Sequence, residues 1–369
     1  MNPNELSLGQ IEDLVRAHGT PLYIVSRSQI RSNFERLNNG LPAAKIFYAT
    51  KANPHSGILE TLQAAGAGFD VASKGEIQAA LQAGADPQRD LIFADTVKDP
   101  KHIAYAYGIG LDDFTFDNAS EITQIARHAP GTKAHLRLAV SNHGSVAHLS
   151  DKFGATPAEA VPLLAAARDA GLVPHGISFH VGSQCLDNQR WIEALETTRQ
   201  VFDAAAAAGM ELRSVDIGGG FPVHYGTENI DIEATCQIIT AHFHRLFGQD
   251  TILVAEPGRA IVGDAMILVT KVISESRRQG QNWLYFDDGT YGSFMEVLLY
   301  QAKYPLRANT SGPVRPYVLA GPTCDSIDVF SRDDAGQIAP VELPDMHLDD
   351  LLIASSMGAY TFSEATRFN

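Results

Sequence analysis

The chain has 369 residues, with 28 Lys and Arg against 43 Asp and Glu, and its formal net charge is −15. This acidic balance argues against nucleic-acid and anionic-membrane partners, so we expect a small-molecule or protein partner. Cys185, Cys236 and Cys324 lack metal-ligand spacing, so we expect neither a zinc site nor a disulfide framework. The amino terminus is polar and no apolar run reaches spanning length, so we expect a cytoplasmic protein without signal peptide or membrane span.

Apolar runs alternate with helix-like segments along the first two thirds of the chain. Helical spacing occurs over 28–39, 75–84, 120–128, 157–171, 188–209 and 231–247. Runs typical of buried strands occur at 46–49, 68–72, 91–94, 114–116, 134–140, 176–181, 212–217 and 252–255. Eight such strands alternating with helices predict an α/β fold, a (β/α)8 TIM-type barrel. An open doubly wound sheet is the alternative; polar residues after nearly every strand favour the barrel, whose active sites lie at that rim.

A different pattern begins after residue 263. Strand-like runs at 265–274, 282–287, 315–320, 339–343 and 351–355 are joined by Gly, Pro and Asp turns, without long helices. A strand near Leu22 is expected to pair with this module. We therefore predict a barrel domain over 28–262 and a mostly β second domain made of 1–27 and 263–369.

Lys51 follows the first predicted barrel strand, in Phe-Tyr-Ala-Thr-Lys-Ala-Asn (47–53). A lysine at the exit of a buried strand is held on a rigid element, partly desolvated and able to lose its proton. Those properties suit covalent chemistry with an aldehyde. A solvated surface amine is the alternative, and this stretch alone favours it.

Three glycines, Gly218, Gly219 and Gly220, follow the seventh predicted strand, and Arg259 follows the eighth. Without side chains, the backbone N–H groups of such a turn can approach a phosphate. A tight turn is the alternative for the triplet alone. Arg259 adds a bidentate donor, and phosphate sites after strands seven and eight are usual in barrels.

Glu256 lies close to this predicted phosphate site, and its carboxylate would repel the phosphate because like charges repel. We therefore expect Glu256 to have a role other than that of a phosphate neighbour. A carboxylate facing a ring nitrogen would keep a pyridine protonated and make the ring an electron sink. His180 then has a role as a flat partner stacked on that ring; a hydrogen-bonded core histidine is the alternative. Arg137, in the fifth strand, is by default a member of an ion pair.

Several motifs together resemble the pyridoxal phosphate (PLP) enzymes of the alanine racemase-like barrel fold, and within them the ornithine decarboxylase group. The resemblance runs from about Pro21 to the last residue. Its motifs are the Lys51 stretch, Gly-Phe-Asp-Val-Ala-Ser-Lys-Gly-Glu (68–76), Lys-Phe-Gly-Ala (152–155), Ser-Phe-His-Val-Gly-Ser (178–183), Asp-Ile-Gly-Gly-Gly-Phe-Pro (216–222), Ala-Glu-Pro-Gly-Arg (255–259), Asp-Gly-Thr-Tyr-Gly-Ser-Phe (288–294), Gly-Pro-Thr-Cys-Asp (321–325) and Met-Gly-Ala-Tyr-Thr (357–361).

The resemblance implies PLP as cofactor and a role for each matching residue. Lys51 would hold PLP covalently, with His180 stacked on the ring and Glu256 on the pyridine nitrogen. The implied phosphate ligands are Ser183, Gly219, Gly220, Arg259 and Tyr360. Asp70, Glu76 and Arg137 would orient Lys51 and neighbouring cofactor groups.

The resemblance also implies a homodimer with shared active sites. The loop carrying Cys324 and Asp325 would enter the partner's active site, where Cys324 returns a proton to the substrate carbon and Asp325 binds the distal amine. Tyr291, Tyr300 and Gln301 complete the expected substrate-binding residues, and no metal is expected. The implied activity is decarboxylation of an L-amino acid, releasing CO2 from ornithine, lysine or a derivative with a modified side chain.

Gln301 departs from the group's pattern, because an acidic residue usually follows the tyrosine matched by Tyr300. An amide cannot balance a second ammonium, so the accepted side chain is expected to be acylated, shorter or otherwise altered. Diaminopimelate decarboxylase is the nearest enzymatic alternative, although that family has Cys-Glu-Ser where this chain has Cys-Asp-Ser (324–326). A racemase and a non-catalytic regulatory homologue are further alternatives. Polyamine or siderophore biosynthesis is the expected pathway.

Overall fold

The computed structural model describes residues 2–141, 152–226 and 230–369. The chain divides into two compact units. Arg31–Pro222 and Ile230–Ile261 form the barrel unit. Met1–Ile30, Val223–Asn229 and Val262–Asn369 form the β unit.

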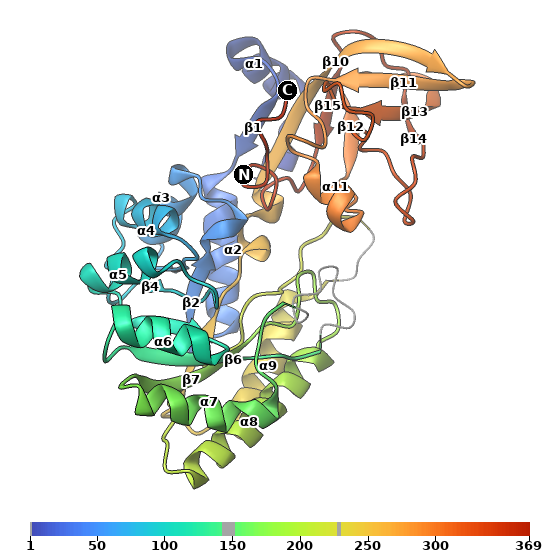
Figure 1. The fold of residues 1–369 in the computed structure, drawn as a ribbon. Helices are drawn as coiled ribbons and strands as arrows, with labels where there is room; N and C mark the ends of the chain where they lie inside the picture. The colour runs from blue at the N-terminus through green and yellow to red at the C-terminus, as the bar shows by residue number, and fades with distance from the viewer. Residues whose placement is uncertain (1, 142–151, 227–229) are drawn as a thin grey trace. The chain divides into compact units, whose positions relative to one another are not determined.

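A ring of parallel strands is the centre of the barrel unit (Figure 1). Its eight described strands are hydrogen-bonded in the order β4-β3-β2-β9-β8-β7-β6-β5, and a parallel bridge between Phe93 and Phe114 joins the two ends. The predicted (β/α)8 barrel is therefore confirmed, and the open sheet is excluded. The strands are β2 (Ala44–Ala49), β3 (Gly68–Asp70), β4 (Leu91–Ile92), β5 (Asp113–Phe116), β6 (Lys133–Leu138), β7 (Val173–Phe179), β8 (Ser214–Asp216) and β9 (Ile252–Ala255).

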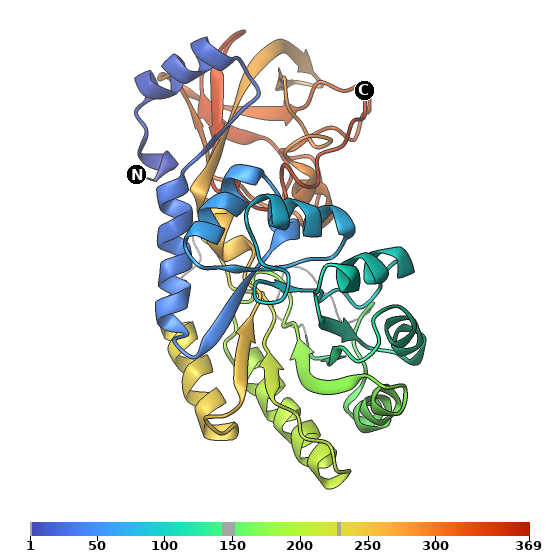
Figure 2. The same cartoon turned by 90° about the vertical axis from the view of Figure 1, so that its left-hand side faces the viewer.

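Helices surround this ring. They are α2 (Arg27–Gly40), α3 (Ser56–Ala64), α4 (Lys74–Gln82), α5 (Pro100–Gly108), α6 (Ala119–His128), α7 (Pro157–Asp169), α8 (Gln189–Ala207), α9 (Ile232–Leu246) and the short α10 (Arg259–Val262). The end of α2 lies beside α9 (Figure 2), where Thr240 donates a hydrogen bond to the Gly40 carbonyl at 3.4 Å. A Cβ on Gly40 would come within 2.8 Å of Cys236 Cβ, so glycine permits this close packing.

The helices begin where the sequence offers capping side chains. An Asx or serine oxygen accepts a hydrogen bond from a first-turn N–H group at Ser73, Asp99, Asn118 and Asp231. Pro100 occupies the first turn of α5, where its missing N–H costs nothing. These caps set where the loops before α4, α5, α6 and α9 end.

The β unit is built on one mostly antiparallel sheet. Its described strands follow the order β12-β15-β10-β11-β13-β14, and β1 (Leu22–Val25) pairs antiparallel with β10. This confirms the expected pairing of the strand near Leu22. The other elements are η1 (Pro3–Glu5), α1 (Leu8–His18), η3 (Gly263–Ala265), β10 (Met266–Arg278), β11 (Gln281–Phe286), α11 (Met295–Tyr300), β12 (Leu306–Ala308), β13 (Val314–Ala320), β14 (Val341–Pro344) and β15 (Leu351–Ala354).

Five of these elements, η1, α1, η3, α11 and β12, are not among the predicted ones, and β10 runs four residues beyond its predicted end. The extension over 275–278 is polar and lacks alternation of apolar residues, but it pairs with β11. The helix α1 begins with a capping box, in which Ser7 and Gln10 bond each other's backbone N–H groups. Pairing and capping therefore override a weak hydrophobic pattern.

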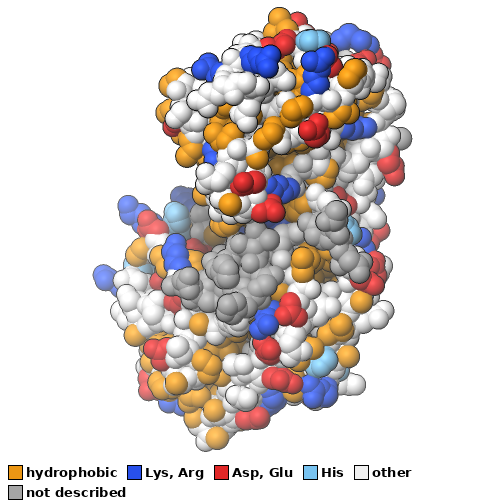
Figure 3. Space-filling view, turned by 90° about the vertical axis from the view of Figure 1, so that its right-hand side faces the viewer, with side chains coloured by type: hydrophobic (Ala, Val, Ile, Leu, Met, Phe, Trp, Pro, Cys, Tyr) orange, Lys and Arg blue, Asp and Glu red, His pale blue; other side chains and the backbone are white. Residues whose placement is uncertain are grey.

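The surface offers no extended basic region on the face drawn in Figure 3, where Lys and Arg side chains are interspersed with Asp and Glu. Among the described helices, none is both long enough and apolar enough to span a bilayer.

Closure of the barrel generates a stability prediction. The Phe114 side chain is fully buried and its ring lies 5.9 Å from that of Phe93, across the bridge that joins β4 to β5. We expect Phe114→Ala to lower the free energy of unfolding by about 3–5 kcal/mol in urea titrations. The substitution leaves a cavity at the place where β4 and β5 close the barrel. Val173→Ala, at a half-exposed position of β7, is the control and should change it by no more than about 0.5 kcal/mol. Equal losses in the two variants would contradict this account.

Candidate active site

Ten of the residues predicted from the sequence belong to the barrel unit and lie at or after the carboxyl ends of its strands. The carboxyl ends of parallel strands in a closed barrel form one rim. These residues are Lys51, Asp70, Glu76, Arg137, His180, Ser183, Gly219, Gly220, Glu256 and Arg259.

Lys51 lies in η2 (Thr50–Ala52), the single turn that follows β2. Its Nζ is 3.4 Å from Asp70 Oδ2; the lysine side chain is half exposed, whereas the aspartate is buried. The Tyr48 hydroxyl donates to the Asn53 carbonyl at 3.1 Å and holds the turn. The structure therefore brings Lys51 and Asp70 together, with the amine at the edge of the solvent.

Glu76 shapes the loop between β3 and α4. Its Oε2 accepts a hydrogen bond from Ala72 N at 2.7 Å, while its own N–H donates to Ser73 Oγ at 3.3 Å. Burial raises the pKa of Glu76, against the lowering effect of the Ala72 hydrogen bond. Glu76 thus fixes the loop that follows Asp70.

The glycine triplet fills a space in which no side chain fits. Gly218 and Gly220 have φ of +63° and +100°, and an added Cβ would lie 2.4 Å from the Phe179 carbonyl oxygen or 2.5 Å from that of Gly182. At Gly219 the Cβ would lie 2.7 Å from the Glu256 carbonyl oxygen. Glycine is required here both by conformation and by close approach.

Arg259 and Ser183 meet beside this turn. Arg259 Nε donates to Ser183 Oγ at 3.2 Å, and the arginine is mostly buried. Cys185 N donates to the Gly220 carbonyl at 2.9 Å, which ties the loop after β7 to the glycine turn after β8. A buried guanidinium, a hydroxyl and a bare backbone are the donors that phosphate groups bind.

His180 is a neutral ring at neutral pH. Its Nδ1 accepts a hydrogen bond from Gly182 N at 2.9 Å, and its Nε2 would lie 3.2 Å from a Cβ on Gly219. Burial, with the positive charges of Arg137 and Lys51, holds the pKa of His180 well below its ordinary value. The Arg137 guanidinium lies 5.2 Å from the centre of the Phe153 ring.

Glu256 and Asp216 form a buried pair of carboxyl groups. They are hydrogen-bonded to each other, and Asp216 Oδ1 also accepts from Gly218 N at 2.8 Å. Burial, together with Asp216 and Asp70, raises the pKa of Glu256 well above its ordinary value, and burial raises that of Asp216. Glu256 Oε1 is buried and has no hydrogen-bond partner among the described residues. A buried carboxyl oxygen of this kind requires a partner.

Asp216 is a site residue that the sequence reasoning missed. It opens the quoted motif Asp-Ile-Gly-Gly-Gly, directly before the glycines, so the clue was its place at the end of a strand. Its role becomes visible only through the contact with Glu256 from the neighbouring strand β9.

The remaining predicted residues belong to the β unit, and two of them meet there. The Tyr291 hydroxyl donates to Asp325 Oδ2 at 2.5 Å, and Ile327 N donates to Asp325 Oδ1 at 3.1 Å. The hydrogen bond from Tyr291 lowers the pKa of Asp325. The neighbouring thiol of Cys324 is free and exposed. Asp325 is therefore an oriented anion beside an accessible thiol.

Gln301 stands apart from that pair within the described β unit. It caps α11 directly after Tyr300, has φ of +55°, and its Nε2 donates to the Leu298 carbonyl at 3.5 Å. No hydrogen bond between Gln301 and Asp325 is found in this part of the chain. The loop that carries Tyr360 is fixed by the hydrogen bond from Gly358 N to the Gly263 carbonyl at 2.9 Å.

Residues 27–263 match the family model described as pyridoxal-dependent decarboxylase, pyridoxal binding domain. This chain belongs to the pyridoxal-dependent decarboxylase family. The resemblance read from the motifs is therefore confirmed at the level of the family.

Two relatives and one solved structure make the comparison concrete. The lysine/ornithine decarboxylase of Selenomonas ruminantium is 40% identical over 365 residues, 99% of this chain and 91% of the relative. A crystal structure of SrLDC with PLP and cadaverine has a TM-score of 0.91 and 38% identity, and covers 98% of this chain and 91% of that one. Antizyme inhibitor 2 of Xenopus laevis is 35% identical over 90% of this chain and 75% of the relative.

Pyridoxal 5′-phosphate is the cofactor of this decarboxylase family, and the barrel fits it. The Gly218–Gly220 backbone with Ser183 and Arg259 offers donors for a phosphate. At the other end, the unpartnered Oε1 of Glu256 offers a buried partner for a pyridine nitrogen. Between them, the neutral His180 offers a flat ring.

The glycine turn generates a binding prediction. We expect Gly220→Ala to raise the dissociation constant for PLP at least ~10-fold in equilibrium titrations, because the Cβ collides with the Gly182 carbonyl and strains a positive φ. Gly248→Ala is the matched control, since nothing lies within 4 Å of its added Cβ. Unaltered PLP affinity in a folded Gly220→Ala protein would contradict the assignment of this turn.

Proposed function

We propose that this protein is a cytoplasmic homodimeric decarboxylase that removes CO2 from an L-diamino acid, namely ornithine, lysine or a derivative with a modified side chain. The observation that carries the proposal is the buried, unpartnered Glu256 Oε1 at the rim that also holds Lys51. When bound, PLP supplies an electron sink for the bond that breaks as CO2 leaves. Polyamine or siderophore biosynthesis is the proposed pathway.

The acid groups around Lys51 prepare it to bind the cofactor's aldehyde carbon. Asp70 holds the amine at 3.4 Å and Glu76 fixes the loop that presents Asp70. The pair of Glu256 and Asp216 retains a proton, because burial raises the pKa of both groups. Glu256 would share that proton with the pyridine nitrogen, and the ring would stay cationic. His180, kept neutral, would cover the ring face without competing for the proton.

The phosphate is assigned to backbone and side-chain donors. Gly219 and Gly220 would bind it through backbone N–H groups, and Ser183 and Arg259 through their side chains. Tyr360 would add its hydroxyl, as the resemblance implies. Arg137 would act through its charge, which helps to keep His180 neutral.

The substrate is assigned to the domain formed by 1–27 and 263–369, while the domain over 28–262 holds the cofactor. Asp325, oriented by Tyr291, is a suitable anion for the distal ammonium of the substrate. Cys324 would return a proton to the substrate carbon, since a thiol S–H is a proton donor and this thiol is exposed beside Asp325. In the proposed dimer this loop serves the partner's site, with Tyr300 and Gln301 along the substrate side chain.

Asp325 and the residues proposed for catalysis also bear on two alternative functions. Diaminopimelate decarboxylase would need a cation for the distal carboxylate of its substrate, whereas Asp325 is an anion. A regulatory homologue remains relevant because one relative is named antizyme inhibitor. Against it, the lysine, the acid pair and the thiol needed for catalysis are all present.

The first test concerns Lys51. We expect the purified protein with PLP to show a visible absorption band that borohydride abolishes, and Lys51→Ala to lack both the band and CO2 release. Lys101→Ala, which changes an exposed lysine outside the quoted motifs, should retain the band and the activity. A normal band in Lys51→Ala, or a normal band without activity toward any amino acid, would contradict the proposed decarboxylase.

The second test concerns Gln301 and the substrate side chain. On a panel of ornithine, lysine, diaminopimelate and N-acylated diamino acids, we expect the natural protein to prefer an acylated or shortened side chain. Gln301→Glu should raise kcat/KM for ornithine and lysine by about tenfold, because a second carboxylate then meets the distal ammonium. Strong activity on free ornithine that this substitution leaves unchanged would remove Gln301 from the specificity site.

A further inference from the structure

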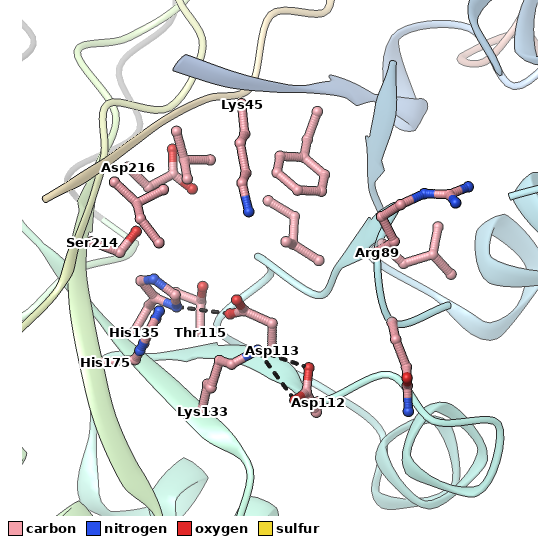
Figure 4. Close-up of a pocket in the computed structure, with 16 residues that line it drawn as sticks. Lys45, Arg89, Asp112, Asp113, Thr115, Lys133, His135, His175, Ser214 and Asp216 are labelled. Carbon is pink, nitrogen blue, oxygen red and sulfur yellow. Dashed lines mark hydrogen bonds and ion pairs between the residues drawn. The ribbon is translucent and has the colours of Figure 1, made fainter. Parts of the chain in front are cut away.

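A cavity of about 180 Å³ lies at the amino end of the barrel, opposite the rim that carries Lys51 (Figure 4). Its lining residues stand at the starts of the strands: Lys45 in β2, Asp113 in β5, Lys133 in β6, Ser214 in β8 and Ile252 in β9. The proposed reaction uses none of these five residues, although it does use Asp216, which also lines the cavity. We call this space the amino-end cavity.

Most charges around the amino-end cavity are paired. The cations with carboxylate partners are Arg89 with Asp90 at 2.7 Å, Lys133 with Asp112 at 3.2 Å and His135 with Asp113 at 2.7 Å. The Lys45 amine points into the cavity in Figure 4, and among the described residues it has no ion pair or hydrogen bond. Lys45 is thus one uncompensated positive charge in a chain of net charge −15.

The cavity has a polar floor, an apolar wall and a solvent-exposed mouth. His135 is buried, and its Nε2 has no hydrogen-bond partner among the described residues. The wall is made by the buried side chains of Phe47 and Val254. Lys45 and Lys133, with its side chain 39% exposed, stand at the mouth. A ligand could therefore enter from solvent and meet a cation first and hydrocarbon further in.

We propose that the amino-end cavity binds a small organic monoanion, whose carboxylate pairs with Lys45 and whose short hydrocarbon chain packs on Phe47 and Val254. A single anionic group matches the single uncompensated cation. The volume has room for a chain of a few carbon atoms beyond the carboxylate. This site is independent of the proposed decarboxylase activity.

Asp216 connects this site with the other end of the barrel. It lines the amino-end cavity and is hydrogen-bonded to Glu256, whose second oxygen is assigned to the pyridine nitrogen. An anion in the cavity opposes ionisation of this acid pair, because like charges repel. Occupancy should therefore weaken PLP binding, and PLP should weaken anion binding by the same factor.

Calorimetric titration with butyrate tests the site directly, without any measurement of activity. We expect saturable binding with a dissociation constant on the order of 1 mM, as befits so small a ligand. Lys45→Met should weaken it about 10-fold, because the charge-assisted contact is lost. Lys101→Met, which removes an exposed lysine outside the cavity, should bind butyrate as the natural protein does.

Each other outcome overturns a defined part of the proposal. Absence of saturable butyrate binding, or equal affinity in Lys45→Met, would overturn the site. Equal binding of inorganic phosphate would show that the apolar wall contributes nothing and would overturn the organic ligand. Equal PLP affinity with and without butyrate would overturn the link through Asp216. A failed decarboxylase assay with normal butyrate binding would affect only the proposed function.

Discussion

Glu256 is partly buried at the rim of the barrel, and its carboxyl oxygen Oε1 is shielded from solvent. A lone ionised carboxylate there would be strongly unfavourable. The chain solves this with Asp216, which shares a hydrogen bond with Glu256 and is itself held by Gly218 N at 2.8 Å. Glu256 N in turn donates to the Gly218 carbonyl at 2.8 Å. The turn proposed to bind the phosphate thus also positions the acid assigned to the ring nitrogen.

Much of this arrangement could be predicted, because in a parallel barrel every residue that follows a strand lies at the same rim. Lys51, Glu256 and Arg259 each follow a buried strand, and that alone places them at one rim. The role of Asp216 could not be predicted in this way. It depends on the register of β8 against β9, in which Asp216 lies opposite Val254. The hydrophobic periodicity of a sequence does not predict which residues of two strands lie opposite each other.

The same alternation of side chains serves both ends of the barrel. In β6, Lys133 and His135 face the amino-end cavity, and Arg137 follows at the next alternate position toward the catalytic rim. Sequence reasoning took up Arg137 but not His135. Only the three-dimensional grouping of strand starts revealed the cavity. Similarly, α11 ends at Gln301 in a left-handed conformation that no hydrophobic pattern predicts.

The short strand β4 affects how firmly the barrel is closed. It consists of Leu91 and Ile92, and beyond it the ring is completed by the hydrogen bonds from Phe93 N to the Asp113 carbonyl and from Thr115 N to the Phe93 carbonyl, both at 3.0 Å. β6 and β7, by contrast, are paired from Lys133 to Leu138. Local opening begins where the fewest backbone bonds must break. The closure between β4 and β5 therefore depends on fewer backbone hydrogen bonds than the β6–β7 pairing, and we expect amide hydrogen exchange to be faster at Phe93 than within β6 and β7.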